Sequence, residues 1–122
     1  MMGQTGVLEK SVKCTSAVAT AFTFAKFGAD DDTADLAAAA TDGIMGILQH
    51  TTTTAGDIVR LMLVGISRLK LGGTVTRGKP LTSDASGKGV QAAAGQSYGA
   101  IAFASGVSGD IIPVFVLPVP AV

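Results

Sequence analysis

The chain has 122 residues, nine basic and nine acidic side chains for a net charge of zero, and a mean hydropathy of +0.49. Balanced, interspersed charge argues against nucleic-acid binding and against electrostatic attachment to membranes, since both need a basic surface. No stretch suits a membrane span, because the apolar closing run 111–122 contains three prolines and is shorter than the roughly 20 residues required. A surface this poor in charge favours an oligomer or a component of a larger assembly.

The N-terminal part of the chain predicts an arm, a strand and an acidic loop. Residues Met1–Ser16 are interrupted by glycine and threonine and have no strong period, which indicates an extended arm. The alternation in residues 17–27 predicts a strand with Phe22 and Phe24 on one face. The run Asp30–Asp32 is expected to be a solvated loop.

The alanine-rich segment 33–41 is open to two interpretations. Its five alanines favour a helix, with Asp32 as a plausible N-cap. Its similarity to residues 90–94, which follow an obvious turn, favours a strand instead. We predict an extended strand at Leu36–Ala40, with a short helical turn allowed near Thr41–Met45.

The rest of the chain consists of apolar runs separated by turn signals. The predicted strands are Ile44–His50, Asp57–Val64, Ile66–Leu71, Pro80–Ser83, Val90–Ala94, Tyr98–Ser105 and Ile111–Leu117. Turns every 8–12 residues between short strands predict a mainly β protein, a small barrel or sandwich with little helix. We expect one β domain over residues 17–117, preceded by the arm 1–16 and followed by an extended tail, Pro118–Val122. Small residues are expected to fill a narrow interior without a ligand cavity.

The chain also matches itself at an offset of 53 residues. Gly46 falls on Gly99, Gly56 on Gly109 and Asp57 on Asp110, within pseudo-repeats at about 36–64 and 89–117. Each copy contains a glycine, a Gly-Asp turn and a strand, which is a scaffold pattern without chemistry. The predicted structural turn residues are Gly46, Gly56, Asp57, Gly72, Gly73, Gly99, Gly109 and Asp110.

No group of residues has the spacing of a catalytic or metal site. His50, the only histidine, has glutamine and threonines for neighbours, and Cys14, the only cysteine, has no histidine nearby. The carboxylates of Asp30–Asp32 and Asp35 lack the glycine and the closing glutamate of an EF-hand. Gly78-Lys79 is followed by proline where a P-loop needs serine or threonine. We therefore predict no enzyme activity, cofactor or metal.

Two segments resemble recurring parts of small phage-encoded capsid decoration (cement) proteins. They are residues 72–94, from Gly-Gly-Thr-Val-Thr to Gln-Ala-Ala-Ala, and residues 39–47, Ala-Ala-Thr-Asp-Gly-Ile-Met-Gly-Ile, paired with a later Ala-Gly-Asp turn. The resemblance extends over Leu36 to Val116. It implies a β-rich protein that binds the outside of an icosahedral phage head as an oligomer, with trimers common, and that has the major capsid protein as its partner.

The resulting hypothesis is a virion structural protein that is made in the host cytoplasm and stabilises the expanded capsid lattice. The apolar positions of the arm and tail are its predicted lattice contacts, namely Val7, Leu8, Val12, Pro118, Val119 and Pro120. Two alternatives stay open: a tail, baseplate or fibre component, and a small cytoplasmic binding module.

Overall fold

In the computed structural model, which describes residues 5–40, 42–94, 96 and 98–119, the chain consists of β-strands, turns and loops. The nine strands are β1 (Thr5–Cys14), β2 (Thr23–Phe27), β3 (Thr33–Leu36), β4 (Ile44–Leu48), β5 (Ile58–Lys70), β6 (Pro80–Ser83), β7 (Gly89–Gln91), β8 (Tyr98–Ala102) and β9 (Ile111–Val119). The predicted mainly β barrel class is confirmed. No helix of these described residues is long and apolar enough to cross a membrane.

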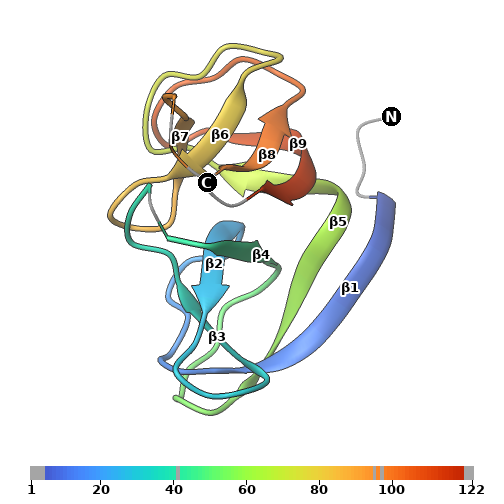
Figure 1. The fold of residues 1–122 in the computed structure, drawn as a ribbon, viewed down its shortest axis with the longest axis vertical. Helices are drawn as coiled ribbons and strands as arrows, with labels where there is room; N and C mark the ends of the chain where they lie inside the picture. Colours follow the sequence, from blue (N-terminus) through green and yellow to red (C-terminus); the bar gives the residue numbers. More distant parts are fainter. Residues whose placement is uncertain (1–4, 41, 95, 97, 120–122) are drawn as a thin grey trace.

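The first five strands close into a barrel. Its antiparallel neighbours are β1 with β5, β5 with β4, β4 with β2 and β2 with β3. A parallel pairing of β3 with β1, in which Lys13 lies opposite Thr33, completes the ring. This first barrel forms the lower half of the molecule in Figure 1.

The last half of β5 begins a second, less complete barrel. It pairs with β9, β9 pairs with β8, β8 with β6, and β6 with β7. A single parallel bridge between Leu71 and Gly89 closes this ring. The order β5-β7-β6-β8-β9 therefore repeats the order β1-β3-β2-β4-β5 of the first barrel, and β5 belongs to both (Figure 1).

The cross-strand register repeats as well. Three pairs of the first barrel have counterparts in the second: Glu9–Met62 with Ile66–Phe115, Ser11–Arg60 with Arg68–Pro113, and Lys13–Ile58 with Lys70–Ile111. The structural repeat thus includes β1 and β2 and extends beyond the segments at 36–64 and 89–117.

Each barrel has its own group of buried side chains. Val12, Val59 and Leu61 belong to the core of the first barrel, whereas Phe24 and Ile47 of that barrel join the buried residues of the second. The junction between the barrels is therefore packed. Leucines, isoleucines, a methionine and a phenylalanine share the interior with alanines and valines, so the expected small residues fill only part of it.

The segment predicted as an N-terminal arm contributes a strand to the first barrel. Along β1 the side chains alternate, because Val12 and Cys14 are buried while Ser11 and Lys13 are exposed. The segment is extended, but from Thr5 onward it is hydrogen-bonded to β5.

The alanine-rich segment is neither helix nor strand after Leu36. The Ala38 N–H donates to the Asp42 carboxylate at 2.8 Å, and the Asp42 N–H donates to the Ala39 carbonyl at 3.2 Å. The predicted strand at Leu36–Ala40 was therefore wrong except at its first residue. Thr41 lies outside the described residues, and Met45 of the suggested helical turn lies in β4.

Other boundaries also differ from the prediction, and three of these differences change how the strands are divided. Phe22 has a φ of 60°, so β2 begins only at Thr23 and the predicted strand over 17–27 is shorter. Gly65 does not separate two strands, because β5 runs through it with a φ of 136°. β9 continues through Pro118 and Val119, which were expected in the tail.

Candidate functional site

The two Gly-Asp turns have the same geometry. Gly56 and Gly109 have φ values of 90° and 92°, which glycine adopts without the steric cost of a Cβ. The carboxylate of the following aspartate, Asp57 or Asp110, accepts the N–H of the residue three positions earlier, at 3.1 and 3.0 Å respectively. Both carboxylates thus hold their turns together.

The other repeated glycines are positions of close approach. A Cβ on Gly46 would lie 2.5 Å from the carbonyl oxygen of Met62. A Cβ on Gly99 would lie 2.6 Å from the Ile44 side chain and 2.9 Å from the ring of Phe24. Gly99 therefore allows the two barrels to pack closely.

Gly72 and Gly73 form a bend after β5 and do not join a hairpin. The Gly72 N–H donates to the Gly89 carbonyl at 2.9 Å, next to the bridge that closes the second barrel. A side chain on Gly72 would collide with the Asp84 carboxylate, whereas one on Gly73 would make only ordinary contact with Val90, at 3.4 Å.

His50 and Cys14 take part in structural contacts. Nδ1 of His50 lies 3.0 Å from the Thr51 carbonyl, and its Nε2 accepts the Arg60 N–H at 3.1 Å, partners that suit the tautomer with its proton on Nδ1. The Cys14 thiol is buried, and its Sγ lies 3.3 Å from the Thr52 hydroxyl. His50 and Cys14 are not in hydrogen-bond contact with each other.

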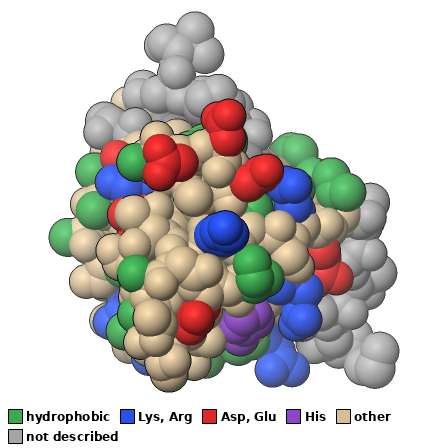
Figure 2. Space-filling view, turned by 90° about the horizontal axis from the view of Figure 1, so that it is seen from below, with side chains coloured by type: hydrophobic (Ala, Val, Ile, Leu, Met, Phe, Trp, Pro, Cys, Tyr) green, Lys and Arg blue, Asp and Glu red, His purple; other side chains and the backbone are tan. Residues whose placement is uncertain are grey.

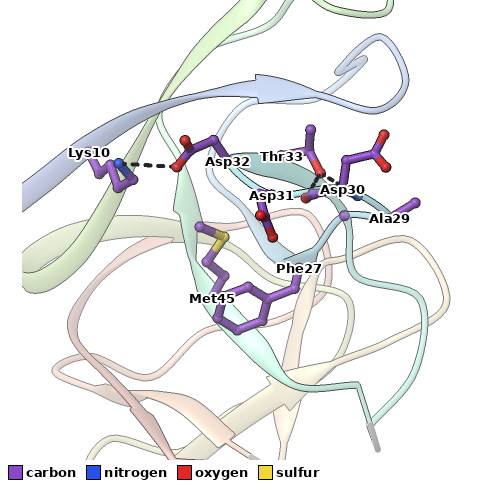
Figure 3. A pocket seen from close by; sticks show the side chains of 9 residues that line it. Lys10, Phe27, Ala29, Asp30, Asp31, Asp32, Thr33 and Met45 are labelled. Atoms are coloured by element: carbon purple, nitrogen blue, oxygen red, sulfur yellow. Dashed lines mark hydrogen bonds and ion pairs between the residues drawn. The ribbon is translucent and has the colours of Figure 1, made fainter.

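The acidic loop, Asp30–Asp32, borders a surface hollow of about 680 Å³ whose apolar lining includes Phe27 and Met45 (Figure 3). Lys10 Nζ lies 3.5 Å from the Asp32 carboxylate, and the Asp30 N–H donates to the Thr33 hydroxyl at 3.2 Å. Among the residues that the structure describes, no three His, Cys, Asp or Glu side chains are grouped as metal ligands.

The backbone at Gly78-Lys79 is already occupied by internal hydrogen bonds. The Gly78 N–H donates to the Ala102 carbonyl at 2.8 Å and the Lys79 N–H donates to the Thr76 carbonyl at 3.2 Å. Neither amide is directed at a phosphate site.

The predicted lattice contacts have different environments. Leu8 is 53% exposed on β1, but Val12 is only 2% exposed and belongs to the core. A direct contact through the Val12 side chain is therefore ruled out in this fold. The side chains of Val7, Pro118 and Val119, and the whole of Pro120, lie outside what the structure describes.

Sequence reasoning missed a continuous apolar surface on the second barrel. In the antiparallel register, Ile66 of β5, Phe115 of β9 and Ile101 of β8 lie side by side. Phe103 stacks on Phe115, with ring centroids 6.4 Å apart. We call this surface the apolar face, made up of Ile66, Ile101, Phe103, Ile111, Phe115 and Leu117. Its sequence signal is the alternation of buried and outward residues from Ile111 to Leu117.

One end of the apolar face is basic and hollowed. Arg68, Ile111, Ile112 and Pro113 line a depression of about 340 Å³, and Lys70 lies directly opposite Ile111. By contrast, Figure 2 shows basic, acidic and hydrophobic side chains interspersed around the histidine at the lower end of the molecule.

Comparison with known proteins yields a fold match only. No protein-family model matches the chain, and no curated protein matches it in sequence. Among solved structures it is similar to the crystal structure of the head fiber gp8.5 N base of bacteriophage phi29, with a TM-score of 0.70 and 15% identity. The match covers 90% of this chain and 93% of that chain. The chain therefore has the fold of a phage head fibre base.

Proposed function

We propose that this chain is a virion structural protein that binds the outer surface of an icosahedral phage head as an oligomer and stabilises the expanded capsid lattice. The observation that carries the proposal is the match, over nine tenths of the chain, to the base of a phage head fibre. The resemblance of residues 39–47 and 72–94 to capsid decoration proteins supports the same conclusion from the sequence. In this role its partners are the major capsid protein and further copies of itself, with a trimer favoured.

The described side chains suit adhesion better than chemistry. The single histidine and the cysteine are held in structural hydrogen bonds, and the carboxylates of the two repeated turns bond their own backbone. Most of the exposed large hydrophobic side chains, in contrast, lie on strands, where a barrel holds them rigidly; Phe103 and Val107 lie between β8 and β9. Leu8 on β1 is the predicted lattice contact that is well placed to touch a capsid subunit.

Stabilisation then follows from linkage. A protein that binds the expanded lattice and not the immature one shifts the equilibrium toward expanded heads at every occupied site. An oligomer that contacts several capsid subunits at once also raises the effective concentration of each contact.

Co-sedimentation with purified phage heads tests the proposal. We expect the protein to pellet with expanded heads at a fixed stoichiometry and to stay in the supernatant with unexpanded heads. Leu8→Lys should reduce pelleting, whereas Arg77→Glu, an exposed change in the 76–79 turn, should leave it unchanged. The proposal is contradicted if the wild-type protein fails to pellet with expanded heads under conditions where its fold is intact.

A second candidate is the base of a fibre that projects from the virion. The neighbour's description as the N base of a head fiber favours it. Electron microscopy of labelled particles separates the two candidates: density lying flat on the lattice supports decoration, whereas density continuing into a stalk supports a fibre base.

A further inference from the structure

The two barrels provide an internal comparison for the apolar face. Ile66 and Phe103 belong to this face, and Pro113 lies beside it. The register and the 53-residue offset place Glu9, His50 and Arg60 at the equivalent positions of the first barrel. This part of the first barrel is polar: Arg60 Nε lies 3.0 Å from the Glu9 carboxylate, and the Arg60 N–H donates to His50. The counterparts of Ile111 and Phe115, in contrast, are the apolar residues Ile58 and Met62. The shared fold therefore does not require apolar side chains at Ile66, Phe103 and Pro113, whereas it places an exposed isoleucine at the position of Ile111 in both barrels.

The remainder of the chain contains a surface complementary to this face. Phe27, at 66%, is the most exposed large hydrophobic side chain of the described residues, and it lies beside Met45 next to the acidic loop (Figure 3). At the basic end of the apolar face, Arg68 lines an open depression, and Lys70 is the cross-strand partner of Ile111, which also lines it. Both surfaces are thus apolar and hollowed, one with acidic side chains and a largely exposed Phe27, the other with basic side chains.

We propose that copies of this chain associate head to tail, with Phe27 of one copy in the depression beside Arg68 of the next. Asp30 and Asp31 of the first copy then face Arg68 and Lys70 of the second. The inference rests on the proposed function for the requirement of an oligomer, and it names the two surfaces that form it. Because the surfaces lie on different barrels, the contact is heterologous, and repeated copies close into a ring if the rotation permits.

A second copy fits the apolar face better than an unrelated partner for reasons of charge. The chain is neutral overall, so copies do not repel one another through net charge. The basic end needs an acidic, aromatic counterpart, and each copy carries one. An aromatic ring against an arginine also gains a cation–π contribution beyond the apolar area that it buries.

Sedimentation velocity of the full chain tests the proposal. We expect the wild-type protein to be a multimer, and Phe27→Ser and Ile111→Lys each to raise its dissociation constant at least about tenfold, as expected of residues central to an interface. Leu8→Lys is the matched control, since Leu8 is similarly exposed but lies on neither surface, and it should associate like the wild type. A thermal unfolding curve for each variant shows that the fold is retained.

Charge reversal tests the pairing itself. Arg68→Glu/Lys70→Glu and Asp30→Lys/Asp31→Lys should each dissociate the multimer, and the chain with all four changes should associate again. Arg77→Glu/Lys79→Glu changes the net charge as much as the first pair does, at exposed positions elsewhere, and should leave association intact.

Four results would overturn the proposal: a monomeric wild type, an Ile111→Lys variant that still associates like the wild type, a Phe27→Ser variant that does so, or a fourfold variant that stays monomeric. Head binding is scored separately. Multimers that respond as predicted but do not pellet with heads would leave this interface standing and contradict the proposed function. A wild-type chain that is monomeric but still pellets with heads would contradict this interface and leave the proposed binding to heads standing.

Discussion

Four glycines at repeated positions are required for two different reasons. Gly56 and Gly109 are surrounded by open space and are needed only for their positive φ. Gly46 and Gly99 are needed because neighbouring atoms leave no room for a Cβ. The same pattern of glycines in the sequence thus encodes a turn at one position and a packing contact at the other.

Alanine substitutions should separate these two requirements. Gly56→Ala and Gly109→Ala should each lower the free energy of unfolding by about 1–2 kcal/mol, the usual cost of the left-handed region for a residue with a Cβ. Gly99→Ala should cost about 2–3 kcal/mol, because it overpacks the junction against Ile44 and Phe24. Urea unfolding measures each value. Gly73→Ala is the control and should stay within about 0.5 kcal/mol of the wild type; an equally mild Gly99→Ala would contradict the packing argument.

A buried amide should stabilise the junction as well. Gln49 Nε2 donates to the Ile47 carbonyl and to the Ser67 hydroxyl, both at 3.0 Å, away from solvent. Gln49→Met keeps the volume but leaves these acceptors without this donor, so we expect a loss of about 1–3 kcal/mol in urea unfolding. Gln91→Met is the exposed control: Gln91 accepts the Thr76 N–H at 2.7 Å, and water can replace it. If Gln49→Met and Gln91→Met lowered the free energy of unfolding equally, burial of the amide would not determine the loss of stability.

At the scale of elements, β5 is the strand on which both barrels depend. Its first half pairs with β1 and β4, and its second half pairs with β9. Ser67 and Leu69 point into the protein while Arg68 points out, which is the alternation of a strand with one buried face. Gly65 lets the strand turn from one ring into the next without ending.

The shared strand predicts that both barrels unfold in one transition. Leu61→Ala in the first barrel should cost about 2–5 kcal/mol, and Val114→Ala in the second should also destabilise the chain, since both side chains are fully buried. Each change should lower the midpoint of the unfolding transition followed by circular dichroism. It should also reduce the protection of backbone amides from hydrogen exchange in both barrels together. If Val114→Ala shifted only the amides of the second barrel, the two barrels would be independent units.

The elements that sequence could predict are those encoded by nearby residues. Turn glycines and alternating apolar runs located β4, β6 and β9, because both signals are local. The role of β1 depends on pairing with β5 some fifty residues away, which local alternation does not report. The alanines after Leu36 follow neither propensity, because the Asp42 carboxylate caps their turn.

The candidate surfaces were harder to predict than the strands. Leu8 and Val12 looked alike as apolar residues of an arm, and only the barrel shows that one is outside and the other is in the core. The apolar face crosses three strands, so it needs the register of β5, β8 and β9 before it can be recognised. An exposed aliphatic residue can be assigned to an apolar surface only when the residues that lie beside it in the fold are known.

At the scale of the whole molecule, the proposed role is binding that stabilises a larger shell. The free energy by which the bound protein stabilises the expanded lattice at each site depends on its concentration. At a free protein concentration of 100 times the dissociation constant, this free energy is about 2.7 kcal/mol. Stabilisation of this kind needs neither a conformational change nor a reactive group in the bound protein.

Expanded heads should therefore resist heat better as the protein is added, until the sites are filled. Light scattering during heating measures the temperature at which heads break open. Ile111→Lys should give a smaller shift at equal total concentration, because a monomer loses the gain from simultaneous contacts. A temperature of disruption that is unaffected by saturating wild-type protein would contradict the stabilising role.

The position of β5 in the chain also sets an order of events during synthesis. Every strand of the first barrel lies before residue 71, so all of them leave the ribosome before the strands of the second barrel. β9, which pairs with the second half of β5, emerges last. Because Phe24 and Ile47 of the first barrel pack among buried residues of the second, we expect the early strands to remain unprotected in the nascent chain until the C-terminal strands join β5.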